Sequence, residues 1–186
     1  MKRAAAVLML MGMLTGCFSA ESELERGMEL RTKLLAAAAC TFQADITADY
    51  GDKLYTFSME CRGDDRGDLS FTVQLPESIS GITGCVSDSK GKLTFDDVAL
   101  DFPLLTDGLI SPVSGPWVFL KTLRSGYITS AATESELLHL SIDDSFEDDA
   151  LHLDIWLNGE DIPVRAEILW GGQRYLSMDV KNFRLE

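Results

Sequence analysis

The stretch CTFQADITA at residues 40–48, followed by KLYTFSMEC at residues 53–61, carries an apolar side chain at every second position. Alternation with a period of two is typical of a β-strand that is buried on one face only. A tight turn at Tyr50-Gly51 would fold the two runs into an antiparallel hairpin in which Phe42 lies opposite Met59. All apolar side chains of both runs then share one face, so we predict a hairpin with one buried face.

The same alternation continues along most of the chain. Further alternating runs lie at residues 68–75, 82–87, 92–95, 98–104, 127–133, 136–143, 151–157, 164–170 and 174–183. Two segments have a different pattern. Residues 22–39 combine the capping-box spacing of Ser22 and Glu25 with apolar residues at helical intervals, which predicts a packed helix. Residues 111–126 hold an apolar run that ends at Gly126 and predict one short helix.

About ten strands with one apolar face each predict a mainly β domain with some helix. A sheet of this size curls, so we expect a strongly curved, unclosed antiparallel half-barrel that forms a meander. Its concave face needs either helices or a ligand to cover it, and the chain has one leading helix and one inserted helix. The chain contains no repeat and no internal linker, and residues 22–186 are expected to form a single domain.

The N-terminus has the pattern of an export signal. Lys2 and Arg3 precede an apolar run at residues 4–14, which is too short to span a bilayer comfortably. The run ends in Leu14-Thr15-Gly16-Cys17, which resembles the bacterial lipobox, where the cysteine is lipidated and becomes the new N-terminus. We therefore predict a signal peptide at residues 1–16, a lipidated Cys17 and a short tether at residues 17–21. The alternative is ordinary signal cleavage near Ser19-Ala20.

The charge of the chain narrows the range of partners. The formal net charge is −14, and loss of Lys2 and Arg3 with the leader would make the exported domain more acidic still. Such a charge repels phosphates and anionic headgroups. Nucleic acid is therefore not an expected partner, and contact with a membrane must come through the lipid anchor or an apolar surface. The expected location is the extracytoplasmic face of the cell envelope.

Three cysteines remain in the exported domain, where disulfides can persist. The hairpin register predicted above places Cys40 directly opposite Cys61, which makes a disulfide between them plausible. The alternative is a pair of buried, reduced cysteines that act as small apolar side chains. Cys85 would then have no partner within the chain.

Enzymatic motifs are not evident in the sequence. A phosphate-binding loop, a dinucleotide-binding fingerprint and a nucleophile elbow are all missing, so we predict no enzyme, no catalytic residue and no cofactor. Pairing of Ile142 with Leu151 would place His139 opposite Asp154, which predicts a surface histidine–carboxylate contact rather than a metal site. The acidic segment at residues 143–149 matches no EF-hand and is expected to be a solvated loop, with calcium binding as the less favoured alternative.

The concave face has a surplus of large apolar side chains. One interpretation is a filled core, and the other is a ligand cavity with the inserted helix as a lid. In the second interpretation the lining residues are Phe42, Tyr55, Phe57, Met59, Phe71, Val73, Phe102, Trp117 and Leu120.

The order of these patterns resembles the LolA/LolB-like lipoprotein carrier superfamily, including LppX-like lipoproteins and the N-terminal domain of RseB-type sensors. The resemblance covers nearly the whole exported chain. It rests on the following patterns: Phe42-x-Ala44-x-Ile46, Tyr55-x-Phe57-x-Met59, Leu69 to Val73 continuing to Pro76, and a helix ending in Leu120-x-x-Leu123. It implies a curved, unclosed sheet with helices over its concave side that binds acyl chains or lipidated polypeptides without catalysis. A soluble carrier has no lipobox, so the lipobox here favours a receptor, a membrane-tethered binder or a Gram-positive relative over a shuttling carrier.

Two functional hypotheses follow. In the first, a membrane-anchored lipoprotein binds lipid, acyl chains or a lipidated polypeptide in its apolar concave sheet. In the second, the same scaffold has a filled core and docks without catalysis onto an envelope protein, such as a cell-wall or sporulation or germination enzyme or a signalling partner.

Overall fold

The computed structural model describes the chain from Gly16 to Glu186, with gaps at residues 88–89, 96–97, 104 and 107–108. The predicted signal peptide therefore falls almost entirely outside the described residues. In chain order the elements are α2 (Gly16–Ala36), β1 (Ala39–Asp49), β2 (Leu54–Asp64), β3 (Leu69–Leu75), the 3-10 turn η1 (Glu77–Ile79), β4 (Thr83–Ser87), β5 (Lys90–Phe95), β6 (Val98–Pro103), β7 (Leu105–Thr106), β8 (Leu109–Ile110), the 3-10 turn η2 (Pro112–Ser114), α3 (Gly115–Ser125), β9 (Tyr127–Glu134), β10 (Leu137–Asp143), β11 (Leu151–Leu157), β12 (Pro163–Trp170) and β13 (Gln173–Leu185).

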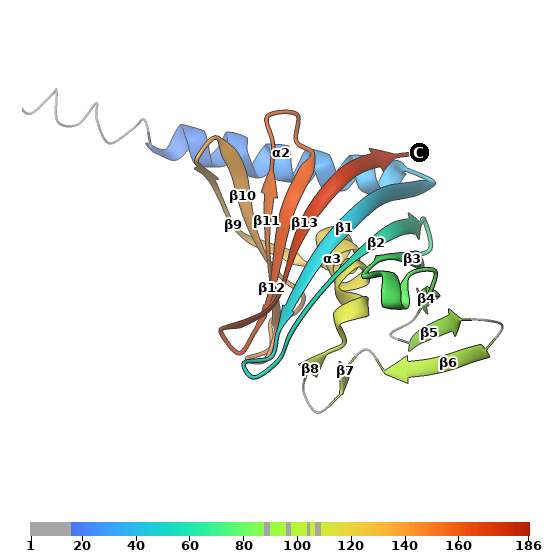
Figure 1. Cartoon of the computed structure of the whole chain (residues 1–186). Helices are drawn as coiled ribbons and strands as arrows, with labels where there is room; N and C mark the ends of the chain where they lie inside the picture. Colours follow the sequence, from blue (N-terminus) through green and yellow to red (C-terminus); the bar gives the residue numbers. More distant parts are fainter. Residues whose placement is uncertain (1–15, 88–89, 96–97, 104, 107–108) are drawn as a thin grey trace, which may run out of the picture.

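Eleven strands form one antiparallel sheet in the order β6-β5-β4-β3-β2-β1-β13-β12-β11-β10-β9. The sheet is curved and open, with β6 and β9 at its two edges (Figure 1). The predicted mainly β, unclosed architecture is confirmed. It consists of two meanders, β1 to β6 and β9 to β13, which meet where the first strand pairs with the last. The small β7–β8 pair lies outside the main sheet.

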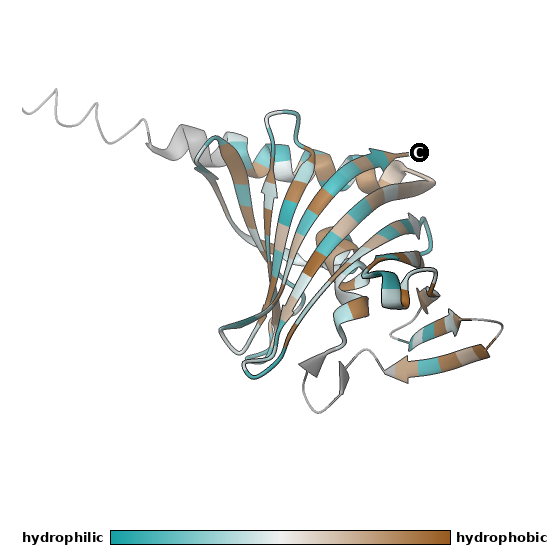
Figure 2. Cartoon of the chain, in the orientation of Figure 1, coloured by the Kyte–Doolittle hydropathy of each residue, from teal (hydrophilic) through white to brown (hydrophobic). Residues whose placement is uncertain are grey.

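The core lies between the concave face of the sheet and α3. Figure 2 shows the alternation of apolar and polar residues along the long strands, and α3 lies inside the curve. The helix has Pro116 in its first turn and ends at Ser125. The N–H of the capping residue Gly126 donates to the Thr122 carbonyl at 2.8 Å. Trp117, Phe119 and the other apolar residues of α3 are buried against the strands. The predicted inserted helix is therefore confirmed.

The N-terminal helix α2 differs from the predicted one in extent and in packing. It begins at Gly16 rather than Ser22, so residues 17–21 lie within the helix. Its packed face consists of Gly27, Leu30 and Leu34. A Cβ on Gly27 would lie 2.9 Å from Cδ1 of Leu140, which shows how closely the helix approaches the sheet. The helix thus packs through a glycine that is not part of its pattern of apolar residues.

The predicted register of the first hairpin is wrong by two residues. Cys40 lies opposite Gly63, and Phe42 lies opposite Cys61. The reason is a turn of four residues rather than two, in which the Tyr50 N–H donates to the Lys53 carbonyl at 3.0 Å. Because side chains alternate with a period of two, an even shift leaves the apolar residues on the predicted face.

Candidate functional site

The residues predicted to line a cavity lie in the core of the domain. Phe42, Met59, Phe71, Val73, Trp117 and Leu120 are buried and belong to one apolar cluster, and Phe57 and Phe102 are partly buried against it. Tyr55 is 46% exposed and stands at the rim, where its ring lies 6.1 Å from that of Tyr50. The structure thus places α3 in the position that a ligand cavity would occupy.

Specific contacts hold α3 against the sheet. Nε1 of Trp117 donates to the Gly67 carbonyl at 3.0 Å, and the ring of Phe119 meets that of Phe42 edge-on at a centroid distance of 5.7 Å. A Cβ on Gly63 would lie 2.5 Å from Cδ1 of Leu120, so this glycine makes room for the helix. At the other end, Nε of Arg31 donates to the Leu123 carbonyl at 2.7 Å and joins α2 to α3.

Two buried donors near this junction lack a partner among the described residues. They are Nη2 of Arg31 and Nε of Arg124. Burial also lowers the pKa of Arg31. A buried donor without an acceptor costs roughly 1–3 kcal/mol. The docked position of α3 therefore combines extensive apolar burial with an electrostatic penalty.

The apolar face of the sheet extends beyond the part that α3 covers. In the β5–β6 hairpin, Phe95 pairs with Val98 and Leu93 pairs with Leu100, which places all four side chains on one face. Leu93 and the neighbouring Phe102 pack against the core. In contrast, Phe95, Val98 and Leu100 are 55%, 70% and 64% exposed. These three residues form a surface, here called the hairpin face, that continues the core into solvent.

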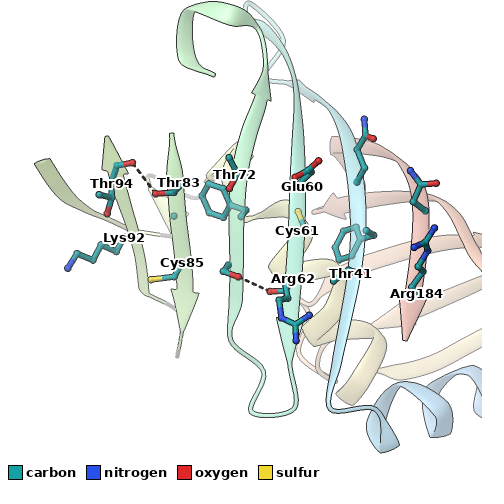
Figure 3. A pocket seen from close by; sticks show the side chains of 16 residues that line it. Thr41, Glu60, Cys61, Arg62, Thr72, Thr83, Cys85, Lys92, Thr94 and Arg184 are labelled. Carbon is teal, nitrogen blue, oxygen red and sulfur yellow. Dashed lines mark hydrogen bonds between the residues drawn. The ribbon is translucent and has the colours of Figure 1, made fainter. Parts of the chain in front are cut away.

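A hollow of about 830 Å³ lies on the opposite side of the sheet, where outward-facing side chains of β13 and β1 to β5 surround it (Figure 3). Its lining is mostly hydroxylic or charged. The polar lining residues are Thr41, Gln43, Glu60, Arg62, Ser70, Thr72, Thr83, Lys92, Thr94, Asn182 and Arg184. The side chains of these residues offer many hydrogen-bonding groups to the hollow. Sequence reasoning missed this hollow because its residues are ordinary outward positions spread over six strands.

Cys40, Cys61 and Cys85 are free thiols. Cys40 and Cys61 are buried on neighbouring strands, and burial raises the pKa of both thiols. Since the register that placed them directly opposite each other is wrong, the disulfide stays a prediction that has lost its geometric support. Cys85 is exposed beside the hollow.

The predicted histidine–carboxylate contact is confirmed, although its predicted register is wrong. Ile142 pairs with Leu153, yet Nε2 of His139 still lies 2.8 Å from Oδ1 of Asp154. The same carboxylate oxygen lies 3.2 Å from Nε2 of His152. The ring of His139 stacks on Trp156 at a centroid distance of 4.6 Å. Asp154 therefore bridges two histidines on the outer face of the sheet.

The charges and hydrogen bonds of this network shift the pKa values of His152 and Asp154. Burial alone lowers the pKa of His152, but the hydrogen bond to Asp143 and the charges of Asp154 and Asp143 outweigh burial and raise it. Burial alone raises the pKa of Asp154, but hydrogen bonds from Ser141 and His139 and the histidine charges lower it. The protonated form of His152 and the ionised form of Asp154 are both favoured in the folded protein.

The raised pKa of His152 predicts a pH-dependent effect of His152→Gln. A folded-state pKa above the unfolded value adds stability that is present below the unfolded pKa and is lost as pH rises through the folded pKa. We expect the variant to lose more unfolding free energy at about pH 5.5 than at about pH 9, on either side of the ordinary histidine range. Urea unfolding of both proteins at the two pH values measures this, and an equal loss at both would contradict it.

Among the described residues, no group of three or more histidine, cysteine, aspartate or glutamate side chains is arranged to hold a metal ion. The acidic segment at residues 143–149 forms a loop in which the Asp144 carboxylate accepts the Leu151 N–H at 2.8 Å. In the part of the chain that the structure covers, no helix is both long and apolar enough to cross a bilayer.

Solved structures with the same fold are recognisable at very low sequence identity. A putative outer membrane lipoprotein-sorting protein domain from Vibrio parahaemolyticus superposes over 89% of this chain and 93% of its own, with a TM-score of 0.50 and 8% identity. A DUF1329 family protein from Desulfovibrio piger covers 90% of this chain and 93% of its own, with a TM-score of 0.50 and 10% identity.

A LolA superfamily protein from Nitrosomonas europaea covers 90% of this chain and 93% of its own, with a TM-score of 0.46 and 9% identity. No protein-family model and no curated protein sequence matches the chain. The likeness to the first two structures concerns the fold alone. The predicted fold, a curved and unclosed sheet with a helix inside its curve, is shared with these two structures.

Proposed function

We propose that this protein is a lipoprotein of the cell envelope, anchored through lipid on Cys17, that binds an acyl chain of an amphipathic ligand on the concave side of its sheet. The ligand would cover the hairpin face and continue toward the core beside α3. The proposal assigns binding and no catalysis to the domain.

The hairpin face is the observation that carries this proposal. Phe95, Val98 and Leu100 together expose apolar surface that is continuous with the core through Leu93 and Phe102. Soluble proteins rarely leave large continuous apolar patches uncovered, and such patches mark sites for ligands, membranes or partners. An acyl chain is flexible and purely apolar, so it can follow a curved sheet face that offers few hydrogen-bonding groups.

The unpartnered buried donors at the docked helix α3 support the same function. Its docked position leaves Nη2 of Arg31 and Nε of Arg124 buried without a partner among the described residues. Movement of α3 away from the sheet would let water reach these donors and recover part of the cost. A ligand chain that enters beside α3 would therefore meet a helix whose docked position is partly penalised.

A second candidate is docking of an envelope protein, which the free edge of β6 favours. This strand is the last of the main sheet, so its outer backbone groups face no neighbouring strand of that sheet. Free strand edges accept an added strand from a partner. In this case the hairpin face would contact side chains of the partner rather than a lipid.

Binding of a fluorescent fatty acid to the chain from residue 18 onward tests the first proposal. We expect saturable binding that Leu100→Glu weakens about tenfold or more, because burial of a leucine contributes roughly 1.5–3 kcal/mol. Fluorescence titration of both proteins measures the two dissociation constants.

Ala99→Glu is the matched control, since Ala99 is exposed on the other face of the same strand. We expect it to leave the dissociation constant unchanged. Equal effects of the two substitutions would contradict a site on the hairpin face. Absence of saturable binding to the parent protein would favour the protein-docking candidate.

A further inference from the structure

The helix α2 carries an apolar stripe that does not pack on the domain. Leu24, Met28 and Leu35 are 42%, 46% and 59% exposed, whereas Leu30 and Leu34 on the neighbouring face are buried. A helix that packs on a domain usually exposes a polar face. The stripe occupies the C-terminal part of the helix, which spans Gly16–Ala36.

The stripe is in phase with Cys17 along the helix. Cys17 precedes Leu24, Met28 and Leu35 by seven, eleven and eighteen positions. At about 3.6 residues per turn these spacings equal roughly two, three and five full turns. Since the helix already begins at Gly16, position 17 and the three exposed residues lie along one line on its surface.

The helix is tied firmly to the rest of the domain. Arg26 forms an ion pair with Asp161 at 2.6 Å, in the turn between β11 and β12. The Thr133 hydroxyl of β9 donates to the Glu23 carboxylate at 2.6 Å. Together with the Arg31 bond to α3, these contacts fix the direction in which the stripe faces. These contacts hold the helix from Glu23 onward, and the helix continues from there back to Gly16.

We propose that the Leu24, Met28 and Leu35 stripe lies in the headgroup region of the bilayer when Cys17 is acylated, so that α2 rests along the membrane surface. The inference rests on the proposed lipid anchor and adds a fixed orientation of the domain. An interfacial helix buries its apolar face roughly 5–10 Å deep and needs no basic patch when acyl chains supply the attachment. The charged pair Glu29 and Lys33 lies on another side of the helix and would stay in water.

Membrane affinity alone does not test this inference, because two or more acyl chains hold the protein with or without the stripe. Site-specific photocrosslinking does. We would produce the full chain in a host that acylates it, replace Met28 with p-benzoylphenylalanine, reconstitute the protein into phosphatidylcholine vesicles and irradiate. Mass spectrometry then measures lipid adducts. We expect the yield of lipid adducts to be several-fold higher with the photocrosslinker at position 28 than at position 29. Glu29 lies on the other side of the helix and is the matched control.

The possible outcomes distinguish contact of the stripe with the membrane from attachment of lipid to Cys17. An acylated, vesicle-bound protein that gives equal lipid adducts at Met28 and Glu29 would overturn the inference and leave the anchor intact. Adducts to a second protein chain at Met28 would overturn it in favour of a dimer contact. A protein without acyl groups on Cys17 would overturn both the anchor and the orientation. The Leu35 position provides a second site, which should give lipid adducts as Met28 does.

Discussion

Replacement of Phe119 by alanine is expected to lower the free energy of unfolding by about 3–5 kcal/mol, the usual cost of removing a fully buried phenylalanine. Phe119 is 0% exposed and lies between α3 and the strands, with its ring edge-on to Phe42. The substitution removes the largest fully buried side chain and leaves a cavity under the helix. Chemical denaturation followed by circular dichroism measures the change.

Lys121→Ala is the matched control on the same helix. Lys121 is exposed and its ammonium group lies 5.1 Å from the centre of the Trp117 ring. An exposed contact of this kind contributes about 0.5–1 kcal/mol. If Phe119→Ala cost no more than Lys121→Ala, α3 would not be an integral part of the core, and the account of the concave face would be wrong.

Cys17→Ala is expected to abolish incorporation of labelled palmitate into the protein. In the proposed lipobox, Cys17 is the residue that would accept the lipid, so its loss removes the acceptor. Metabolic labelling followed by electrophoresis and autoradiography measures the incorporation. The uncleaved apolar run at residues 4–14 can itself hold the variant at a membrane. The decisive measurement is therefore the incorporated palmitate label and not the cellular location of the protein.

Cys85→Ala provides the control for this experiment. Cys85 is an exposed free thiol, and its substitution should leave the palmitate label unchanged. A palmitate label that remains in Cys17→Ala but disappears in Cys85→Ala would show that the lipid is attached to Cys85 and not to Cys17. The proposed anchor and the orientation inferred from α2 would then both be incorrect.

Alternation in the sequence predicts which face of each strand is buried but not how the strands pair. Phe42, Met59 and Val73 are buried as their positions in the pattern predict. The pairing of Cys40 with Gly63 depends on the length of a turn, and the turn at residues 50–53 is set by local hydrogen bonds rather than by hydrophobicity. An even error of this kind leaves every face correct, and hence hydrophobic alternation alone does not reveal it.

Other features depend on contacts between distant parts of the chain. The pairing of β1 with β13 joins the two ends of the domain, and no local pattern encodes it. The same holds for the polar hollow, whose walls come from six strands. In α2, apolar residues at helical spacing predict a packed helix, but Gly27 decides which side packs, and Leu24 and Met28 remain exposed as a result.

The central claim is that the concave side of this sheet binds an acyl chain. Native mass spectrometry of the chain from residue 18 onward, exported behind a cleavable leader and purified without detergent, tests it most directly. Because this chain lacks Cys17, any lipid found by solvent extraction is bound rather than covalently attached. We predict a discrete mass increase that corresponds to one lipid and disappears on extraction. A clean apo mass, together with no uptake of added fatty acid, would contradict the claim.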